Sequence, residues 1–165
     1  MKKIIINVLF ITYFILTIIV TYSLLSYNKY NISEFDDHYI LTIKENINEI
    51  KTSDLLSIKK STNLNLNDYV FYYDTHNAQV TVKIAQIKKI ESVSDQEKTI
   101  VLDNELILSS ENILGTINNT TRYPLLGNVY NILTSKWGYP IIIILPMLVA
   151  FIYEVYEIAK EIKKK

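Results

Sequence analysis

The residue types that most often carry chemistry are few in this 165-residue sequence. It contains no cysteine, which excludes disulfides, zinc–thiolate sites and thiol catalysis. Its two histidines, His38 and His76, are isolated from each other, and neither has a second histidine at the spacing of a helical metal site. We therefore expect both to be exposed turn or strand-edge residues, and we predict neither a metal nor a cofactor.

Other short motifs also exclude classes of function. The sequence has no phosphate-binding loop, no dinucleotide fingerprint and no basic, aromatic-rich segment of the kind that binds nucleic acid. The formal net charge is +0, from 17 basic and 17 acidic residues, so no global field favours a polyanionic partner. Glycosylation sequons begin at Asn31, Asn118 and Asn119 and would matter only in a eukaryotic secretory compartment. We expect no nucleic-acid partner.

Two apolar segments predict transmembrane helices that hold the rest of the chain at a lipid bilayer. Ile4–Asn28 contains no charged side chain and is long enough to cross the ~30 Å hydrocarbon layer. A cleaved signal peptide is the alternative, but the sequence after this run offers no convincing small-x-small cleavage site. A second apolar segment begins at Trp137; Pro140 suits its first turn, and Pro146 should kink it.

The charges predict the orientation of these helices. Lysines cluster at both chain ends, whereas residues 27–136 hold 11 basic and 14 acidic residues, so both termini should be cytoplasmic by the positive-inside rule. Glu154 and Glu157 should lie at the interface or face the first helix. Tyr27, Tyr30, Trp137 and Tyr139 would form an aromatic belt at the outer surface of a plasma membrane. The predicted order is a cytoplasmic end at 1–3, a transmembrane helix at 4–28, an extracytoplasmic β domain at 29–136, a transmembrane helix at 137–159 and a basic cytoplasmic tail at 160–165.

Strand patterns dominate the segment between the two helices. Residues 79–87 alternate, with Val80, Val82 and Ile84 on one face and Thr81 and Lys83 on the other. Further strands are expected at 38–44, 68–73, 98–102 and 105–110. Residues 74–78 should form a hairpin turn, and Asp103-Asn104 a two-residue turn. We expect no full-length amphipathic helix here, so the predicted fold is a mainly β domain flanked by two transmembrane helices.

Several short motifs in the second half of the chain occur in a known order. They are Ile113-Leu114-Gly115, Pro124-Leu125-Leu126-Gly127, Trp137-Gly138 and Tyr153-Glu154. Together they resemble the carboxyl end of type I signal peptidases of the endoplasmic-reticulum and archaeal type, which also occur in Gram-positive bacteria. Upstream, Ser53-Asp54 and Asn67-Asp68 resemble the two Gly-Asp elements of that family, with the glycines replaced. The resemblance implies a signal-peptidase-like β fold.

The catalytic boxes of that family are altered in this sequence. The resemblance places Glu45 where the family has its serine nucleophile and Val82 where it has its histidine or lysine base. The third box is reduced to the region of Asp103 and Asn104. A carboxylate and an isopropyl group cannot act as nucleophile and base, so we expect no catalysis at these positions. If the register is shifted, Ser53, Ser57 or Ser61 could be the nucleophile and Lys83 the base.

The resemblance therefore leads to one favoured function and two alternatives. The favoured function is a non-catalytic, signal-peptidase-like protein that binds or assists exported precursors by accepting an extended segment as an added strand. Its partners would be the lipid bilayer, an exported precursor or signal peptide, and an active peptidase, sortase or pilin system. One alternative is an active signal peptidase, a serine endopeptidase with a relocated Ser/Lys dyad. The other is a bitopic membrane protein whose β domain binds another envelope component.

Overall fold

The computed structural model of the chain describes residues 2–47, 49–61, 63–74, 80–92 and 98–163. The chain divides into two compact units. One unit contains the two ends of the chain, Met1–Leu24 and Val129–Lys165, and its described residues are mainly helical; the other, Leu25–Asn128, contains the described strands. The predicted β-rich domain and two apolar helices are therefore present.

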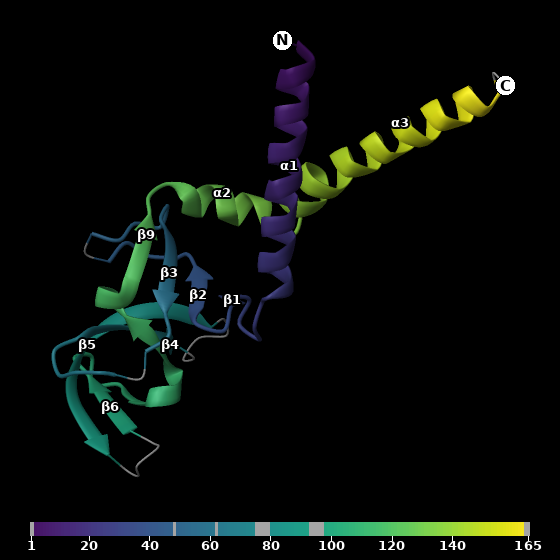
Figure 1. The fold of residues 1–165 in the computed structure, drawn as a ribbon. Coiled ribbons are helices and arrows are strands. Elements are labelled where there is room, and N and C mark those ends of the chain that lie inside the picture. Colours follow the sequence, from purple (N-terminus) through teal and green to yellow (C-terminus); the bar gives the residue numbers. More distant parts are fainter. Residues whose placement is uncertain (1, 48, 62, 75–79, 93–97, 164–165) are drawn as a thin grey trace. The chain divides into compact units, whose positions relative to one another are not determined.

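A small antiparallel sheet forms one part of the β domain. Its strands lie in the order β1 (Ser33–Glu34), β2 (His38–Leu41), β3 (Leu55–Lys59) and β9 (Thr120–Tyr123), as Figure 1 shows. β3 is central and pairs with β2 on one side and with β9 on the other. The strand predicted at 38–44 ends at Leu41, although Ile43 continues into the core.

A larger antiparallel sheet forms the other part of the domain. It has the order β7-β6-β5-β4-β8. These strands are β4 (Tyr69–Asp74), β5 (Thr81–Ser92), β6 (Lys98–Leu102), β7 (Ile107–Ser109) and β8 (Ile113–Thr116). The 3₁₀ turns η1 (Ser110–Asn112) and η2 (Ile117–Asn119) connect β7 to β8 and β8 to β9. The β4–β5 pairing confirms the predicted hairpin, whose turn lies outside the described residues together with His76.

β4 is buried on both faces and separates two apolar clusters. Phe71 and Tyr73 pack with Leu56 and Ile58 of β3 on one side. On the other side lie Val70 and Tyr72, with apolar residues of β5 and β6. Burial of this kind on two faces explains why residues 68–73 read as a continuous apolar run rather than an alternating one.

The alternation predicted in β5 is confirmed, whereas one predicted turn is wrong. Val80, Val82 and Ile84 all pack against the cluster that contains Phe71. The turn between β6 and β7 was expected to consist of Asp103 and Asn104 alone. It includes Glu105, which has φ 64° and donates its backbone N–H to Leu102. A residue in the left-handed region closes a three-residue hairpin loop. The Asp-Asn pair is typical of a two-residue turn, so the sequence did not indicate the third residue.

The helical unit contains two helices that are long and apolar enough to cross a membrane, over Asn7–Leu25 and Tyr139–Ile162. The first lies within α1 (Lys2–Leu25), and the second consists of the π-helix η3 (Tyr139–Ile144) and α3 (Leu145–Ile162), with Pro140 in its first turn. The short helix α2 (Leu126–Leu133) was not predicted, because eight residues give little periodic signal. Val20 of α1 packs with Leu133 of α2 and Ile143 of η3.

Candidate functional site

The position that the resemblance assigns to the catalytic base is partly buried against the hydrophobic core. Val82 lies opposite Tyr73 in the β4–β5 pairing, and its side chain packs with the apolar cluster of β3 and β4. A side chain at this position points between the two sheets. Catalysis at Val82 is therefore unsupported by both its chemistry and its surroundings.

Lys83, the alternative base, points to the opposite face of β5 and is held by an ion pair. Its ammonium lies 2.7 Å from Oδ2 of Asp74, whose side chain is only 7% exposed. The hydrogen bond with Asp74 is the largest of the effects that raise the pKa of Lys83, and the negative charge of Glu45 adds to it. Glu45 therefore lies within electrostatic range of Lys83, whereas Val82 lies on the other face of β5. A lysine base must be uncharged near neutral pH, and these carboxylates favour the charged form.

The three candidate serines are not brought to Lys83. Ser53 precedes β3, and its hydroxyl lies 3.5 Å from the carboxylate of Asp54. Ser57 lies in the middle of β3, between paired residues of β2 and β9. Ser61 follows β3 and donates to the carbonyl of Asn63 at 3.4 Å. Among the described residues, no hydrogen bond joins Lys83 to any of these serines, so the proposed Ser/Lys dyads are not formed.

Ser61 does lie beside other lysines. It lines a groove of about 550 Å³ with Lys60 and Lys98. Lys60 donates to Glu34 at 2.9 Å and lies 4.8 Å above the ring of Tyr39. Its ammonium group is thus already engaged by a carboxylate and an aromatic ring.

The two aspartates of the Gly-Asp-like elements organise turns. Oδ2 of Asp54 accepts the backbone N–H of Lys51 at 3.0 Å and lies 3.5 Å from Nε of Arg122 on β9. Asp68 accepts the backbone N–H of Asn65 at 3.1 Å in the turn before β4. Both carboxylates thus fix the chain where it enters a strand, which is a structural role.

Asp103 and Asn104, which the resemblance places at the third box, also have a local role. Oδ1 of Asp103 accepts the backbone N–H of Gln86 at 3.3 Å. The side-chain amide of Asn104 donates to the hydroxyl of Tyr72 at 2.9 Å. Both residues therefore tie the β6–β7 loop to the large sheet. Neither contact places an acidic group beside a nucleophile.

A groove runs beside the edge strand β9. It has a volume of about 430 Å³ and is lined by Glu49, Ile50, Leu56, Tyr69, Ile117, Thr120 and Arg122. Ile50 and Leu56 form an apolar floor, since they are 8% and 0% exposed. The guanidinium of Arg122 donates to the carbonyl of Glu49 at 2.5 Å and keeps the rim in place. β9 pairs with β3 along one edge, and no other described strand pairs with its second edge.

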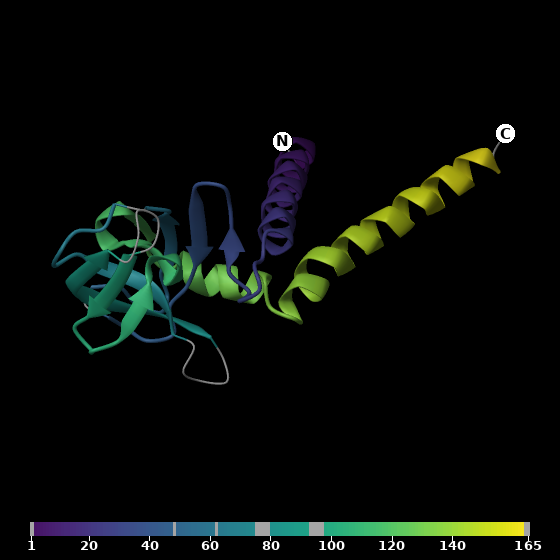
Figure 2. The same cartoon turned by 90° about the horizontal axis from the view of Figure 1, so that it is seen from below.

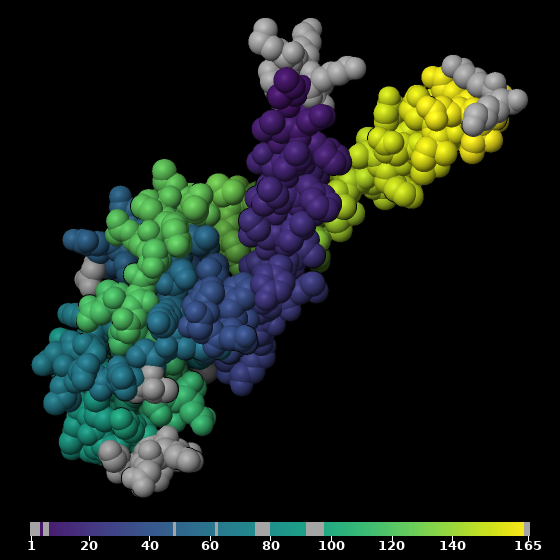
Figure 3. All heavy atoms as spheres, viewed as in Figure 1, coloured from purple at the N-terminus to yellow at the C-terminus, as the bar shows by residue number. Residues whose placement is uncertain are grey.

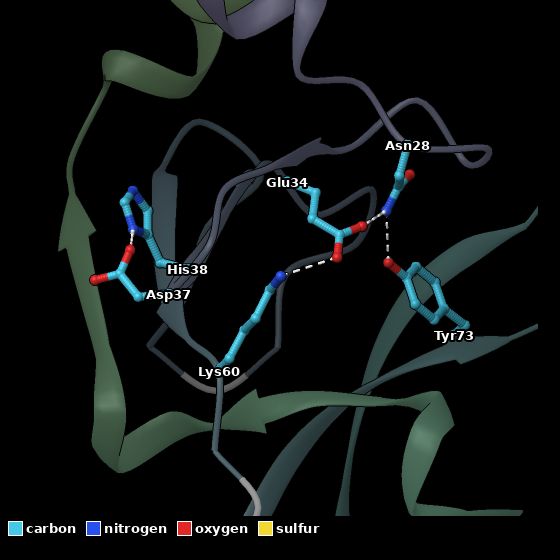
Figure 4. A network of polar contacts seen from close by, with 6 residues as sticks. All are labelled: Asn28, Glu34, Asp37, His38, Lys60 and Tyr73. Atoms are coloured by element: carbon cyan, nitrogen blue, oxygen red, sulfur yellow. Dashed lines mark hydrogen bonds and ion pairs between the residues drawn. The ribbon is translucent and has the colours of Figure 1, made fainter.

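A polar network connects the segment after α1 to the core of the domain (Figure 4). The side-chain amide of Asn28 donates to Glu34 at 3.1 Å and to the hydroxyl of Tyr73 at 2.9 Å. The bond from Lys60 to Glu34 is the main reason why the pKa of Glu34 is lowered. Burial raises the pKa of Tyr73 to about 12. Four residues from distant parts of the sequence meet here, and no local motif could have identified them.

His38 takes part in a separate contact at the start of β2. Its ring stacks on Phe35 at 5.0 Å and pairs with the carboxylate of Asp37, which lowers the pKa of that carboxyl. Within the described ranges, no group of three or more His, Cys, Asp or Glu side chains is placed to hold a metal ion.

Comparison with protein-family models, curated proteins and solved structures gives no match for this chain.

Proposed function

We propose that this chain is a membrane-anchored, signal-peptidase-like protein that binds extended segments of exported precursors without cleaving them. Two apolar helices would anchor it in a plasma membrane, with both lysine-rich termini in the cytoplasm and the β domain outside. The ordered motifs of the carboxyl half support the signal-peptidase-like fold. The proposal assigns binding to the β domain and gives catalysis no role.

The groove beside β9 is the observation that carries this proposal. An edge strand presents unpaired backbone N–H and C=O groups, and an extended peptide can add to it as a further strand. The apolar floor of Ile50 and Leu56 suits an alternate apolar side chain of such a peptide. Glu49 and Arg122 at the rim offer one charge of each sign. Main-chain pairing would give affinity, and the groove would give selectivity.

The surroundings of the family's catalytic positions support binding without hydrolysis. Val82 packs, partly buried, against the hydrophobic core, and Lys83 is held by Asp74 on the other face of the strand. Amide hydrolysis by a serine mechanism needs a hydroxyl within reach of an uncharged base. Glu45 supplies neither a hydroxyl nor a neutral environment, because its charge favours the ammonium form of Lys83.

A peptide-binding experiment tests the proposal directly. The full chain in detergent is titrated with a fluorescent peptide copied from the region after a signal sequence. Thr120→Trp fills the groove, whereas the matched Thr121→Trp places the same ring on the other face of β9. We expect Thr120→Trp to weaken binding by about tenfold, or ~1.4 kcal/mol, and Thr121→Trp to leave it unchanged. Equal effects of the two variants would contradict a groove-bound peptide.

Backbone chemistry separates strand addition from simple apolar binding. A peptide N-methylated at every second residue keeps its backbone N–H groups along one edge, whereas a fully N-methylated peptide has no backbone N–H group left to donate. The first should bind and the second should not. If both bind equally, the peptide is not held as a strand. Mass spectrometry of the same mixtures should show intact peptide, and cleavage by the unaltered protein would refute the non-catalytic part of the proposal.

A serine endopeptidase is the second candidate, because Ser61 shares a groove with Lys60 and Lys98. It predicts cleavage of a precursor with a small-x-small site, abolished by Ser61→Ala. Ser53→Ala and Ser57→Ala serve as matched controls, since neither serine lines that groove. Absence of cleavage by the unaltered protein would exclude this candidate.

A further inference from the structure

The short helix α2 carries a row of apolar side chains that the other described parts of the chain leave about half exposed. Leu126, Val129 and Ile132 are 49%, 49% and 56% exposed. At about 100° per residue, these three side chains fall within about 120° of the helix surface. Single exposed apolar residues are ordinary on a protein surface, whereas a continuous row of them marks a surface that meets another apolar medium. We call this row the α2 stripe.

The rest of α2 faces either the protein or water. Leu133 is buried and packs with Val20 of α1. Asn128 and Asn131 are exposed, and Asn131 lies about 160° around the helix from Val129. The eight residues of α2 include no charged side chain. The uncovered surface of α2 therefore has an apolar side and an amide side, as in helices that lie in the plane of a lipid–water interface.

Contacts with α1 fix the depth of α2. The hydroxyl groups of Tyr130 and Ser23 lie 2.9 Å apart, and Leu133 packs with Val20. Val20 and Ser23 precede Leu25, the last residue of the first apolar helix, by about 7.5 and 3 Å along the helix axis. In Figure 1 and Figure 2, α2 (green) runs across α1 (purple) rather than alongside it. An interfacial helix buries its apolar face about 5–10 Å into the boundary between headgroups and acyl chains, which matches this depth.

A tight connection holds α2 to the start of the second apolar helix. The hydroxyl of Ser135 donates to the carbonyl of Ile132 and accepts the backbone N–H of Gly138, both at 2.8 Å. A Cβ at Gly138 would overlap the carbonyl oxygen of Ile132, so this close approach requires glycine. The hydroxyls of Tyr139 and Thr21 lie 2.9 Å apart and join the second apolar helix to α1. Figure 3 shows the side chains of α1 (purple) and α3 (yellow) uncovered along most of their length, as expected of helices surrounded by lipid.

Exposed apolar residues also flank α2 on both sides. Leu125 is 70% exposed and has φ 64°, a conformation that leucine adopts rarely. Trp137 is 72% exposed, and tryptophan is enriched where lipid meets water. Lys136 beside it is exposed, so its ammonium group is free to reach outward from an interface while the indole stays in it. The chain from Leu125 to Trp137 thus has the composition of an interfacial segment.

We propose that α2 lies in the interface of the outer leaflet, with the α2 stripe among the acyl chains and Asn128 and Asn131 toward the headgroups. Lipid is therefore the partner of the stripe. Since α2 has no charged residue, burial of apolar surface drives this contact, and the contact does not depend on anionic lipid. The inference rests on the membrane anchoring within the proposed function, but not on peptide binding. It adds a third membrane contact to the two apolar helices.

Another protein, or a second copy of this chain, matches the α2 stripe less well. α2 is about 12 Å long, and its three exposed side chains offer far less than the roughly 800 Å² per partner of a stable protein interface. Contact with lipid needs no such area, because the bonds of Tyr130 and Tyr139 with α1 already hold α2 at the interface.

The lack of cysteine in the chain allows a test with single labels on the full protein. Val129→Cys, Asn131→Cys and Ile15→Cys are each labelled with an environment-sensitive fluorophore and placed in lipid nanodiscs, which leave both membrane faces open to the solution. Ile15 is 52% exposed on α1 and serves as the reference inside the bilayer. Lipids with a nitroxide on the upper acyl chain quench labels in the interface, and iodide quenches labels in water. Circular dichroism shows that each labelled variant keeps the fold.

We expect nitroxide lipids to quench the label at position 129 at least about fivefold more than the label at 131, and iodide to show the reverse preference. Both ratios should change less than about twofold when half of the neutral lipid is replaced by anionic lipid. Equal quenching at the two positions would overturn the inference. A label at 129 that neither agent reaches would overturn it too, because protein would then cover the α2 stripe.

The reference position separates this inference from the proposed function. If nitroxide lipids quench the label at Ile15 but not the label at Val129, only the interfacial placement of α2 is refuted. If iodide quenches the label at Ile15, the proposed membrane anchoring fails, and the inference fails with it. Peptide binding at the groove beside β9, measured in the same nanodiscs, reports the rest of the proposed function independently.

Discussion

Raising the pH should weaken the β domain through Tyr73, by an amount that follows from the burial of its phenol. Tyr73 is only 8% exposed, and burial raises its pKa from 10.0 to about 12. Folding favours the neutral phenol, so burial of Tyr73 in its neutral form contributes to the free energy of unfolding. This contribution is complete below pH 10 and is lost as the pH rises from 10 to 12. At about 1.4 kcal/mol per pKa unit, the loss is ~1.4 kcal/mol at pH 11 and ~2 kcal/mol at pH 12.

Tyr73→Phe is the matched variant, because phenylalanine keeps the ring but cannot ionise. It removes the hydrogen bond from Asn28, which should cost about 1 kcal/mol at neutral pH. The wild-type protein should therefore be more stable at neutral pH and less stable at high pH, with the two curves crossing near about pH 11. Tyr39, whose pKa burial also raises, titrates in both proteins, and its negative charge adds to the rise in the pKa of Tyr73.

Urea unfolding of the full chain in detergent measures this crossing. Far-ultraviolet circular dichroism then reports the β domain, since helices held in detergent resist urea. The free energy of unfolding is compared between the two proteins at several pH values from neutral to about pH 12. A constant difference between wild type and Tyr73→Phe over this range would show that Tyr73 ionises as freely in the folded state as in the unfolded state, and the burial argument would be wrong.

Three further predictions use different observations. Lys83→Met should lower the thermal midpoint more than Lys89→Met, because the carboxylate partner of Lys83 is buried and that of Lys89 is 51% exposed; a catalytic Lys83 would instead lose activity without losing stability. Gly127→Ala should destabilise the domain by about 2 kcal/mol or more in urea unfolding, since a Cβ there would lie 2.6 Å from a backbone carbonyl oxygen, and an unchanged midpoint would contradict that packing. Reporter fusions at Asn119 and Lys165 should report opposite sides of the membrane, and finding both on one side would refute the proposed topology.

The sequence predicted those parts of the fold that local patterns encode. Alternation in residues 79–87 was sufficient to place Val82 on the core-facing side of the strand and Lys83 on the other face, and both assignments hold. The apolar runs at 68–73 and 98–102 likewise became β4 and β6. These predictions needed only the period of two that a strand imposes on its side chains.

The missed features depend on long-range contacts or on single backbone angles. Asp74 was read as a turn residue, and only the β4–β5 register shows that it lies beside Lys83. The left-handed conformation of Glu105 gives the β6–β7 loop three residues, whereas Asp103-Asn104 alone predicted two. The groove beside β9 combines residues from 49 to 122, and no spacing in the sequence indicates that they meet. Tertiary packing, rather than propensity, decides each of these features.

Backbone angles explain which residues fit the turns that contain Ser53-Asp54 and Asn67-Asp68. Asn67 has φ 70°, a conformation that asparagine adopts more readily than most residues other than glycine. Ser53 is not among the described non-glycine residues with positive φ, so no glycine is needed there.

Gly115 and Gly127 lie where a Cβ would be 2.6 Å from a backbone oxygen, so the close approach of two chain segments requires glycine at both positions. These glycines help to hold β8 and the start of α2 against the chain around β3. The β domain thus presents an edge strand and a groove, and the peptide binding proposed for it requires only these.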